Sequence, residues 1–158
     1  MGQVLERKAK LISVTPTVDT SAYASGDHLG DLQELVNALD DTSGTGTIVS
    51  VSVVDRDSQS AEIDVLFFSA QPTIASSDND ALDISDDEMS SKFLGAVKIE
   101  STDYIALANC SAGGVKNAGL LVSATGGSRS LWAQLRSGGS PTYGSPSNLT
   151  LKIGISQD

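Results

Sequence analysis

Hydrophobic and polar residues alternate along several short segments of this 158-residue chain. In residues 149–155, Leu and Ile occupy every second position, and residues 48–54 alternate in the same way with many β-branched side chains. Residues 62–68 begin by alternating and end as a continuous apolar run. These patterns are typical of strands that are half-buried in the first two segments and buried on both faces in the third. The same reasoning indicates further strands at 11–18, 94–99, 104–108, 119–124 and 131–135.

Turn-forming residues separate these segments at fairly even spacing. Clusters of Gly, Ser, Asp and Pro occupy residues 41–46, 55–59, 112–114, 125–128 and 137–141. Pro16 has no backbone N–H to donate, so residues 11–18 should form an edge strand or break at that position. Many short strands with such punctuation predict an all-β fold, a single β-sandwich or jelly-roll-like domain with one or two short helices.

Residues 28–40 are compatible with either a helix or a strand. Five apolar residues of this segment, Leu29, Leu32, Leu35, Val36 and Leu39, fall on one helical stripe. As a strand, the segment would place Glu34 on the same face as Leu32 and Val36 and so bury it. Periodicity alone therefore favours a helix here.

A second, shorter helix is indicated at residues 86–93. Ser85 and Glu88 have the spacing of a capping box, in which Ser85 accepts from the Glu88 backbone N–H and Glu88 reaches back to Ser85. Asp86 and Asp87 add negative charge at the positive end of the helix dipole.

The charge balance limits the partners of the chain. Ten Lys and Arg residues against twenty Asp and Glu residues give a formal net charge of −10. Such an acidic surface repels phosphate backbones, so we expect no nucleic-acid partner. No apolar run approaches the roughly 18 residues of a membrane-spanning helix, so we expect no membrane partner either.

Basic residues gather at the start of the chain, where Arg7, Lys8 and Lys10 lie within four positions. We interpret residues 1–11 as a basic N-terminal arm and residues 12–158 as the β-sandwich domain. The arm is either a solvated tail or a segment that contacts an acidic neighbour, which would be another copy of this protein or a host surface. If it is separate from the domain, deleting residues 1–10 should leave the melting temperature nearly unchanged.

Motifs for catalysis are weak. A Ser/His/Asp hydrolase would have to use His28, beside Asp27 and Asp31, and there is no G-x-S-x-G elbow to expose a nucleophile. A histidine in a surface turn is the better interpretation, and we expect neither an enzyme nor a cofactor. Cys110 is interpreted as a small buried apolar group.

Six carboxylates lie between Asp78 and Glu88, but the stretch lacks the glycine of an EF-hand loop. Calcium binding and a solvated loop ending in a helix cap both stay open for this stretch. The sequence therefore identifies no metal-binding residue.

Short blocks in a fixed order suggest a family. They are TPTVDTSAYASGD (15–27), NA (37–38), GTIVSVSVVDRD (46–57), LFF (66–68), QPT (71–73), DNDALDISD (78–86), LGAV (94–97), GLLV (119–122) and SPTY (140–143). Together they resemble small virion structural proteins of tailed bacteriophages, of the head decoration or cement type. The resemblance runs from residue 15 to residue 155 and its blocks are structural rather than catalytic. It also makes a strand at residues 28–40 as plausible as the helix.

The resemblance implies a role and partners. Proteins of this type are commonly β-sandwiches or jelly rolls that sit on the outside of the capsid, often as trimers. We accordingly expect a virion protein on the capsid surface, with the major capsid protein as partner, in a homotrimer. The apolar run Val65–Phe68 is a second motive for an oligomer, because closed symmetry buries extra apolar surface.

The alternative is a receptor- or carbohydrate-binding module of a phage head or tail fibre. Sugar-binding sites commonly use exposed aromatic rings, and Trp132 is the only tryptophan of the chain. The scarcity of aromatic residues therefore speaks against this alternative.

Overall fold

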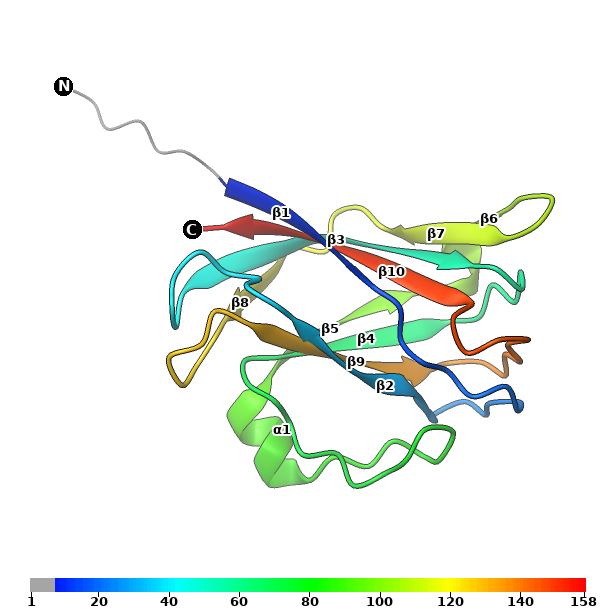
Figure 1. Cartoon of the computed structure of the whole chain (residues 1–158), viewed down its shortest axis with the longest axis horizontal. Helices are drawn as coiled ribbons and strands as arrows, with labels where there is room; N and C mark the ends of the chain where they lie inside the picture. Colours follow the sequence, from blue (N-terminus) through cyan, green and yellow to red (C-terminus); the bar gives the residue numbers. More distant parts are fainter. Residues whose placement is uncertain (1–7) are drawn as a thin grey trace.

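The computed structural model describes residues 8–158 and contains two antiparallel sheets packed face to face (Figure 1). One sheet has six strands: β1 (Lys8–Val14), β10 (Leu149–Gln157), β3 (Thr45–Asp55), β7 (Ser111–Val115), β6 (Tyr104–Ala106) and β8 (Leu120–Ser123). The other has four: β2 (His28–Leu35), β9 (Leu131–Ser137), β4 (Ile63–Phe68) and β5 (Phe93–Ile99). The described helices are α1 (Asp86–Lys92) and the short 3₁₀ turn η1 (Ser101–Asp103). The prediction of an all-β fold is confirmed.

The strand order is that of a jelly roll. β7 pairs with residues 51–55 of β3 and β8 pairs with residues 45–48, so the two occupy successive parts of one strand position. The sheets then have the orders β1-β10-β3-β7/β8, with β6 beyond β7 at the edge, and β2-β9-β4-β5. The chain crosses between sheets from β1 to β2, from β2 to β3 and from β3 to β4, as it does in two wrapped Greek keys.

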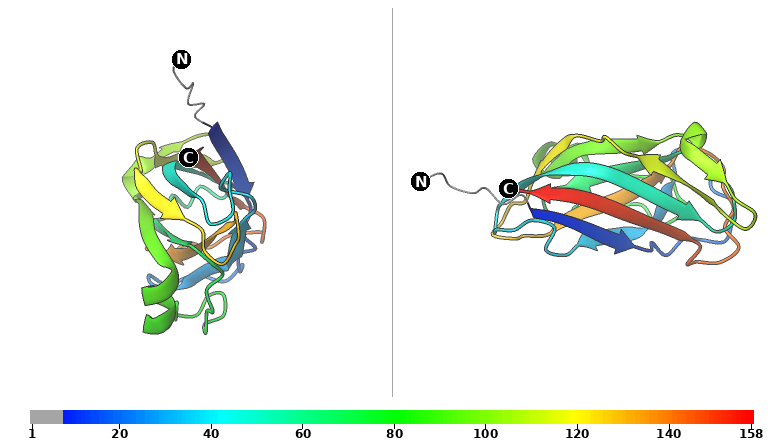
Figure 2. Two further views of the ribbon diagram at one scale, coloured as in Figure 1. Left: turned by 90° about the vertical axis from the view of Figure 1, so that its left-hand side faces the viewer. Right: turned by 90° about the horizontal axis from the view of Figure 1, so that it is seen from above.

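The core lies between the two sheets (Figure 2). Along β10 the residues predicted to point inward, from Leu149 to Ile155, are buried, and their polar neighbours are exposed or half-buried. Leu29, Phe67, Leu135 and Ile153 are fully buried and come from both sheets. Because each strand contributes every second side chain, alternation in the sequence becomes one continuous apolar layer.

Residues 28–35 form strand β2, so the helix that periodicity favoured is wrong. β2 pairs with β9, but its register shifts between Leu29 and Gln33, opposite Leu135 and Ala133. The shift adds two residues to β2 and so leaves the alternation unchanged: Leu29 and Leu35, six positions apart, are both buried, and Glu34 beside Leu35 is exposed. The expected burial of Glu34 is therefore wrong, because the face that it shares with Leu32 and Val36 is the outer side of the strand.

A second correction concerns residues 112–114, which were interpreted as a turn. They lie inside β7, and the turn falls just before, where the Leu107 N–H donates to the Cys110 carbonyl at 2.8 Å. A side chain at Gly113 would collide with the Asp103 carbonyl, and one at Gly114 would collide with the Val51 carbonyl. The glycines allow the neighbouring backbones to approach, which is a strand role for glycine and not a turn role.

Candidate interaction surface

The structure places two of the three basic residues singled out in the sequence. Lys8 and Lys10 belong to β1, whereas Arg7 lies outside the described residues. The Lys8 ammonium donates to an Asp40 carboxylate oxygen at 2.7 Å, and the Lys10 ammonium donates to the Asn37 carbonyl at 2.7 Å. Both lysines thus tie β1 to the turn that follows β2. Residues 8–11, assigned to the arm, are part of the sheet, because their backbone pairs with residues 154–157 of β10.

This pairing reverses the expectation for the N-terminal deletion. Removing residues 1–10 should lower the melting temperature relative to removal of residues 1–7, because it deletes part of the β1–β10 ladder and both lysine contacts. A few lost contacts of about 0.5–1.5 kcal/mol each would lower it by several degrees. Differential scanning calorimetry of the two truncations measures the difference, and identical melting temperatures would contradict it.

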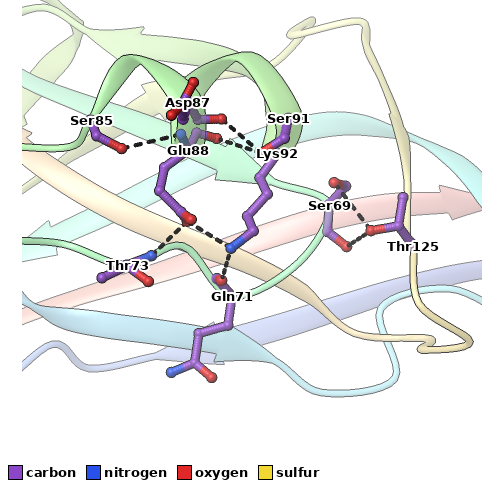
Figure 3. Close-up of polar contacts among 9 residues, drawn as sticks. All are labelled: Ser69, Gln71, Thr73, Ser85, Asp87, Glu88, Ser91, Lys92 and Thr125. Carbon is purple, nitrogen blue, oxygen red and sulfur yellow. Dashed lines mark hydrogen bonds and ion pairs between the residues drawn. The ribbon is translucent and has the colours of Figure 1, made fainter.

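The acidic segment, residues 78–88, packs with α1 over the outer side of the four-stranded sheet (Figure 1), and Figure 3 shows the polar contacts of α1. Ser85 caps α1 as predicted, with its hydroxyl accepting from the Glu88 N–H at 3.3 Å. Glu88 does not complete the capping box. Its carboxylate instead accepts from the Lys92 ammonium at 2.6 Å and from the Thr73 N–H at 2.8 Å, contacts that hold its pKa below the ordinary value.

The other end of the acidic segment is anchored by hydrogen bonds. Asp78 accepts from the Tyr23 hydroxyl at 2.7 Å and from the Gly30 N–H at 2.8 Å. Burial, followed by the Asp78 carboxylate, raises the pKa of Tyr23. Asn79 donates to Asp19 at 3.1 Å and lowers the pKa of that carboxyl. These acids act as loop anchors, and residues 8–158 bring together no group of three or more metal-ligating side chains.

His28 is buried at the start of β2 and does not lie in a surface turn. Its Nδ1 lies 3.1 Å from both the Ser76 carbonyl and the Ser76 hydroxyl. The His28 backbone also pairs with Asp80 and Asn79. The histidine therefore fastens the acidic segment to β2, and the surface-turn interpretation is wrong. Cys110 is partly exposed, not buried as expected.

The apolar run Val65–Phe68 has no surface to offer to an oligomer. Val65, Phe67 and Phe68 are fully buried and Leu66 is 9% exposed. Val65 and Phe67 face the core, while Leu66 and Phe68 are covered on the outer side of the sheet by Leu82, Met89 and Phe93. The homotrimer stays a prediction, but this run no longer motivates it.

Exposed apolar side chains gather elsewhere, on the outer side of the six-stranded sheet. Leu11 is 64% exposed, Ile105 69% and Leu121 69%. Directly paired residues lie on one face, so the strand registers collect them with their neighbours. We define the bare face as these residues: Ala9, Leu11, Ser13, Thr47, Val49, Ser50, Ser52, Val54, Ile105, Ala112, Gly114, Leu121, Thr150, Lys152, Gly154 and Ser156.

The bare face is hollowed along its middle. A groove of about 350 Å³ is lined by Leu11, Val49 and Gly154, and a second of about 200 Å³ by Ile105, Gly114 and Lys116. Ser50 lines both grooves, so they meet on β3.

The two sheets differ in what covers them. Residues 69–92, including α1, run along the outer side of the four-stranded sheet, and no described segment lies over the bare face (Figures 1 and 2). Apolar side chains left uncovered in a group, and not scattered singly, mark a binding surface. None of the described helices is long and apolar enough to cross a membrane.

The comparisons with known proteins add little to this geometry. No family model matches the chain, and no curated protein matches it. Among solved structures, a chain of the heated full particle of Israeli acute paralysis virus is 13% identical with a TM-score of 0.35, covering 99% of this chain and 75% of that one. Chains of Desmodium yellow mottle tymovirus and of the native Kashmir bee virus virion are each 9% identical with TM-scores of 0.28. They cover 99% of this chain and 85% and 74% of those chains, respectively. None of the three is described as a bacteriophage, and TM-scores this low carry no argument about function.

Proposed function

We propose that this chain is a virion structural protein that binds the outside of a phage capsid and stabilises it, as a decoration or cement protein does. The observation that carries the proposal is the bare face, a group of uncovered apolar side chains on one side of a compact jelly roll. The order of sequence blocks from residue 15 to residue 155 supports the capsid as the place where that face is used.

The proposal includes the major capsid protein as partner, a homotrimer as the bound form and no enzymatic role. A protein that binds only the assembled lattice stabilises the lattice by mass action, and needs a binding surface but no reactive group. Of the polar side chains considered for chemistry, His28 and Asp78 are engaged in holding the acidic segment in place.

The test is the number of copies on purified particles. Quantitative mass spectrometry of particles of the virus that encodes the chain should find hundreds of copies. Removing the chain should lower the temperature at which the particles release their genome, and adding it back should restore that temperature. A count of tens or fewer would indicate the fibre module instead, and absence from the particles would overturn the proposal.

A further inference from the structure

The charges of the molecule are unevenly distributed between its two sides. Within the strands of the six-stranded sheet the only carboxylate is Asp55, which is buried, at 1% exposure. The four-stranded sheet and the segment over it hold Asp31, Glu34 and Asp64, and all six carboxylates from Asp78 to Glu88. In a chain with net charge −10, the described strand positions of the bare face therefore carry one ionisable side chain, Lys152, while Lys10 lines the first groove and Asp103 and Lys116 line the second.

Three cations around the bare face have no partner among the described residues, whereas Lys10 donates to the Val36 and Asn37 carbonyls. Most described lysines and arginines form an ion pair or donate to a backbone carbonyl, as Lys92 does with Glu88 and Arg136 with Asp64. Arg56, Lys116 and Lys152 form no such contact within residues 8–158. Lys152 lies on the bare face, Lys116 lines its groove and Arg56 directly follows β3.

The position of the carboxylates argues against a second copy of this chain as the protein that covers the bare face. Two bare faces placed against each other would bring like charges together. A head-to-tail contact would place the bare face of one copy on the acidic side of the next. Because these two sides are opposite each other in the sandwich, as Figure 2 shows, that contact would continue as an open chain and would not close.

We propose that the bare face docks on a different protein, at an apolar surface patch that is surrounded by carboxylates. The partner's apolar side chains fill the groove over Gly154 and Ser50, and its carboxylates pair with Lys116, Lys152 and Arg56. This inference rests on the proposed function, in which the partner is the capsid shell. It places the six-stranded sheet against the shell and α1 with its acids toward solvent.

Depletion of charge at the centre with apolar side chains in a hollow is the composition of an interface core. Charge at the rim mainly accelerates the encounter and gives it a dependence on salt. A substitution in the groove should therefore weaken the apolar contribution to docking, and a substitution of a lysine should reduce the dependence of docking on salt.

The experiment measures rebinding of the intact chain to particles from which it has been removed. Leu11→Glu places a carboxylate in the groove and should weaken binding at least about tenfold, the effect of an interface hot spot. Val36→Glu is the matched control, because Val36 is 54% exposed, equally apolar and outside the bare face. It should rebind within about twofold of the wild type. Both side chains face solvent, so circular dichroism and melting temperature should show that both variants fold.

Two further arms test the chemistry of the partner. Lys152→Glu should weaken binding and flatten its salt dependence, while Lys98→Glu, on the other sheet, should change neither. Converting the carboxylates of the stripped particles to neutral amides should weaken binding of the wild type. Unchanged binding to amidated particles would overturn the inference that carboxylates surround the apolar patch of the partner.

The outcomes separate the two proposals. If the wild type does not rebind at all, the proposed function fails and this inference falls with it. If the wild type rebinds and Leu11→Glu rebinds equally well, the chain is a capsid-binding protein but the bare face is not its docking surface. If sedimentation shows a dimer that Leu11→Glu converts to a monomer, the occupant is a second copy and the inference is wrong.

Discussion

Substituting Gly114 by alanine should destabilise the protein by about 3–5 kcal/mol, the upper range for a single substitution. Gly114 lies in β7 beside β3, and its backbone φ of 149° is one that residues with a side chain rarely adopt. An added methyl group would collide with the Val51 carbonyl and lie 2.7 Å from the Ser52 Cα. Since backbone cannot swing aside as a side chain can, β7 must separate from β3.

Gly119→Ala is the matched control for this prediction. Gly119 also has a positive φ, of 63°, but nothing lies within 4 Å of the position that its Cβ would take. The Gly119→Ala substitution should therefore lower the free energy of unfolding only by the roughly 1–2 kcal/mol that an unfavourable backbone conformation costs. Urea denaturation of both variants gives the comparison. Equal losses would mean that β7 yields easily and that its close approach to β3 is unimportant for stability.

Replacing Gln134 with leucine should cost about 1–3 kcal/mol, although leucine is apolar and the site is fully buried. The Gln134 amide donates to the Gly30 carbonyl at 3.2 Å and to the Leu135 carbonyl at 2.9 Å. It also lies 3.5 Å from the Leu29 carbonyl, and of these residues Gly30 is one that the β2 bulge leaves outside the ladder. Leucine has a similar volume but no donor, so these carbonyls would stay buried without that partner.

Gln33→Leu, at the other end of the same bulge, is the control. Gln33 is half-buried and its amide contacts only its neighbour Asp31, so the free energy of unfolding should change by no more than about 0.5 kcal/mol. Amide hydrogen exchange gives a second readout, since the Gln134 variant should lose protection at β2 before the other strands. A Gln134→Leu protein as stable as the wild type would show that burial of leucine offsets the lost donor.

Much of the fold could be predicted because alternation is a local signal. Residues 48–54 and 149–155 formed strands close to their expected bounds, and Ser85 capped α1. The errors came where a distant residue decided the local structure. β2 is a strand because β9 pairs with it and Gln134 serves its bulge. Gly113 and Gly114 belong to a strand because β3 and residues 103–104 pass close to them.

The candidate interaction surface was much harder to predict from the sequence. Clustering of Arg7, Lys8 and Lys10 along the chain suggested an arm, but the structure uses Lys8 and Lys10 to hold β1 to the turn after β2. Leu11, Ile105 and Leu121 lie far apart in sequence and look like ordinary members of three strands. Only the registers of β1, β10, β3, β7, β6 and β8 bring their side chains to one face.

The amino-acid sequence by itself determined that this chain is all-β, where most strands run and where one short helix begins. It did so because side-chain alternation and capping depend on residues a few positions apart. The tertiary structure alone decided which sheet is covered. Alternation gives every strand two sides. The outer side of β4 is buried because residues 69–92 pass over it, and the outer side of β3 and β10 stayed open because no described segment does. A pattern of period two cannot encode that difference, since it depends on where a distant loop travels.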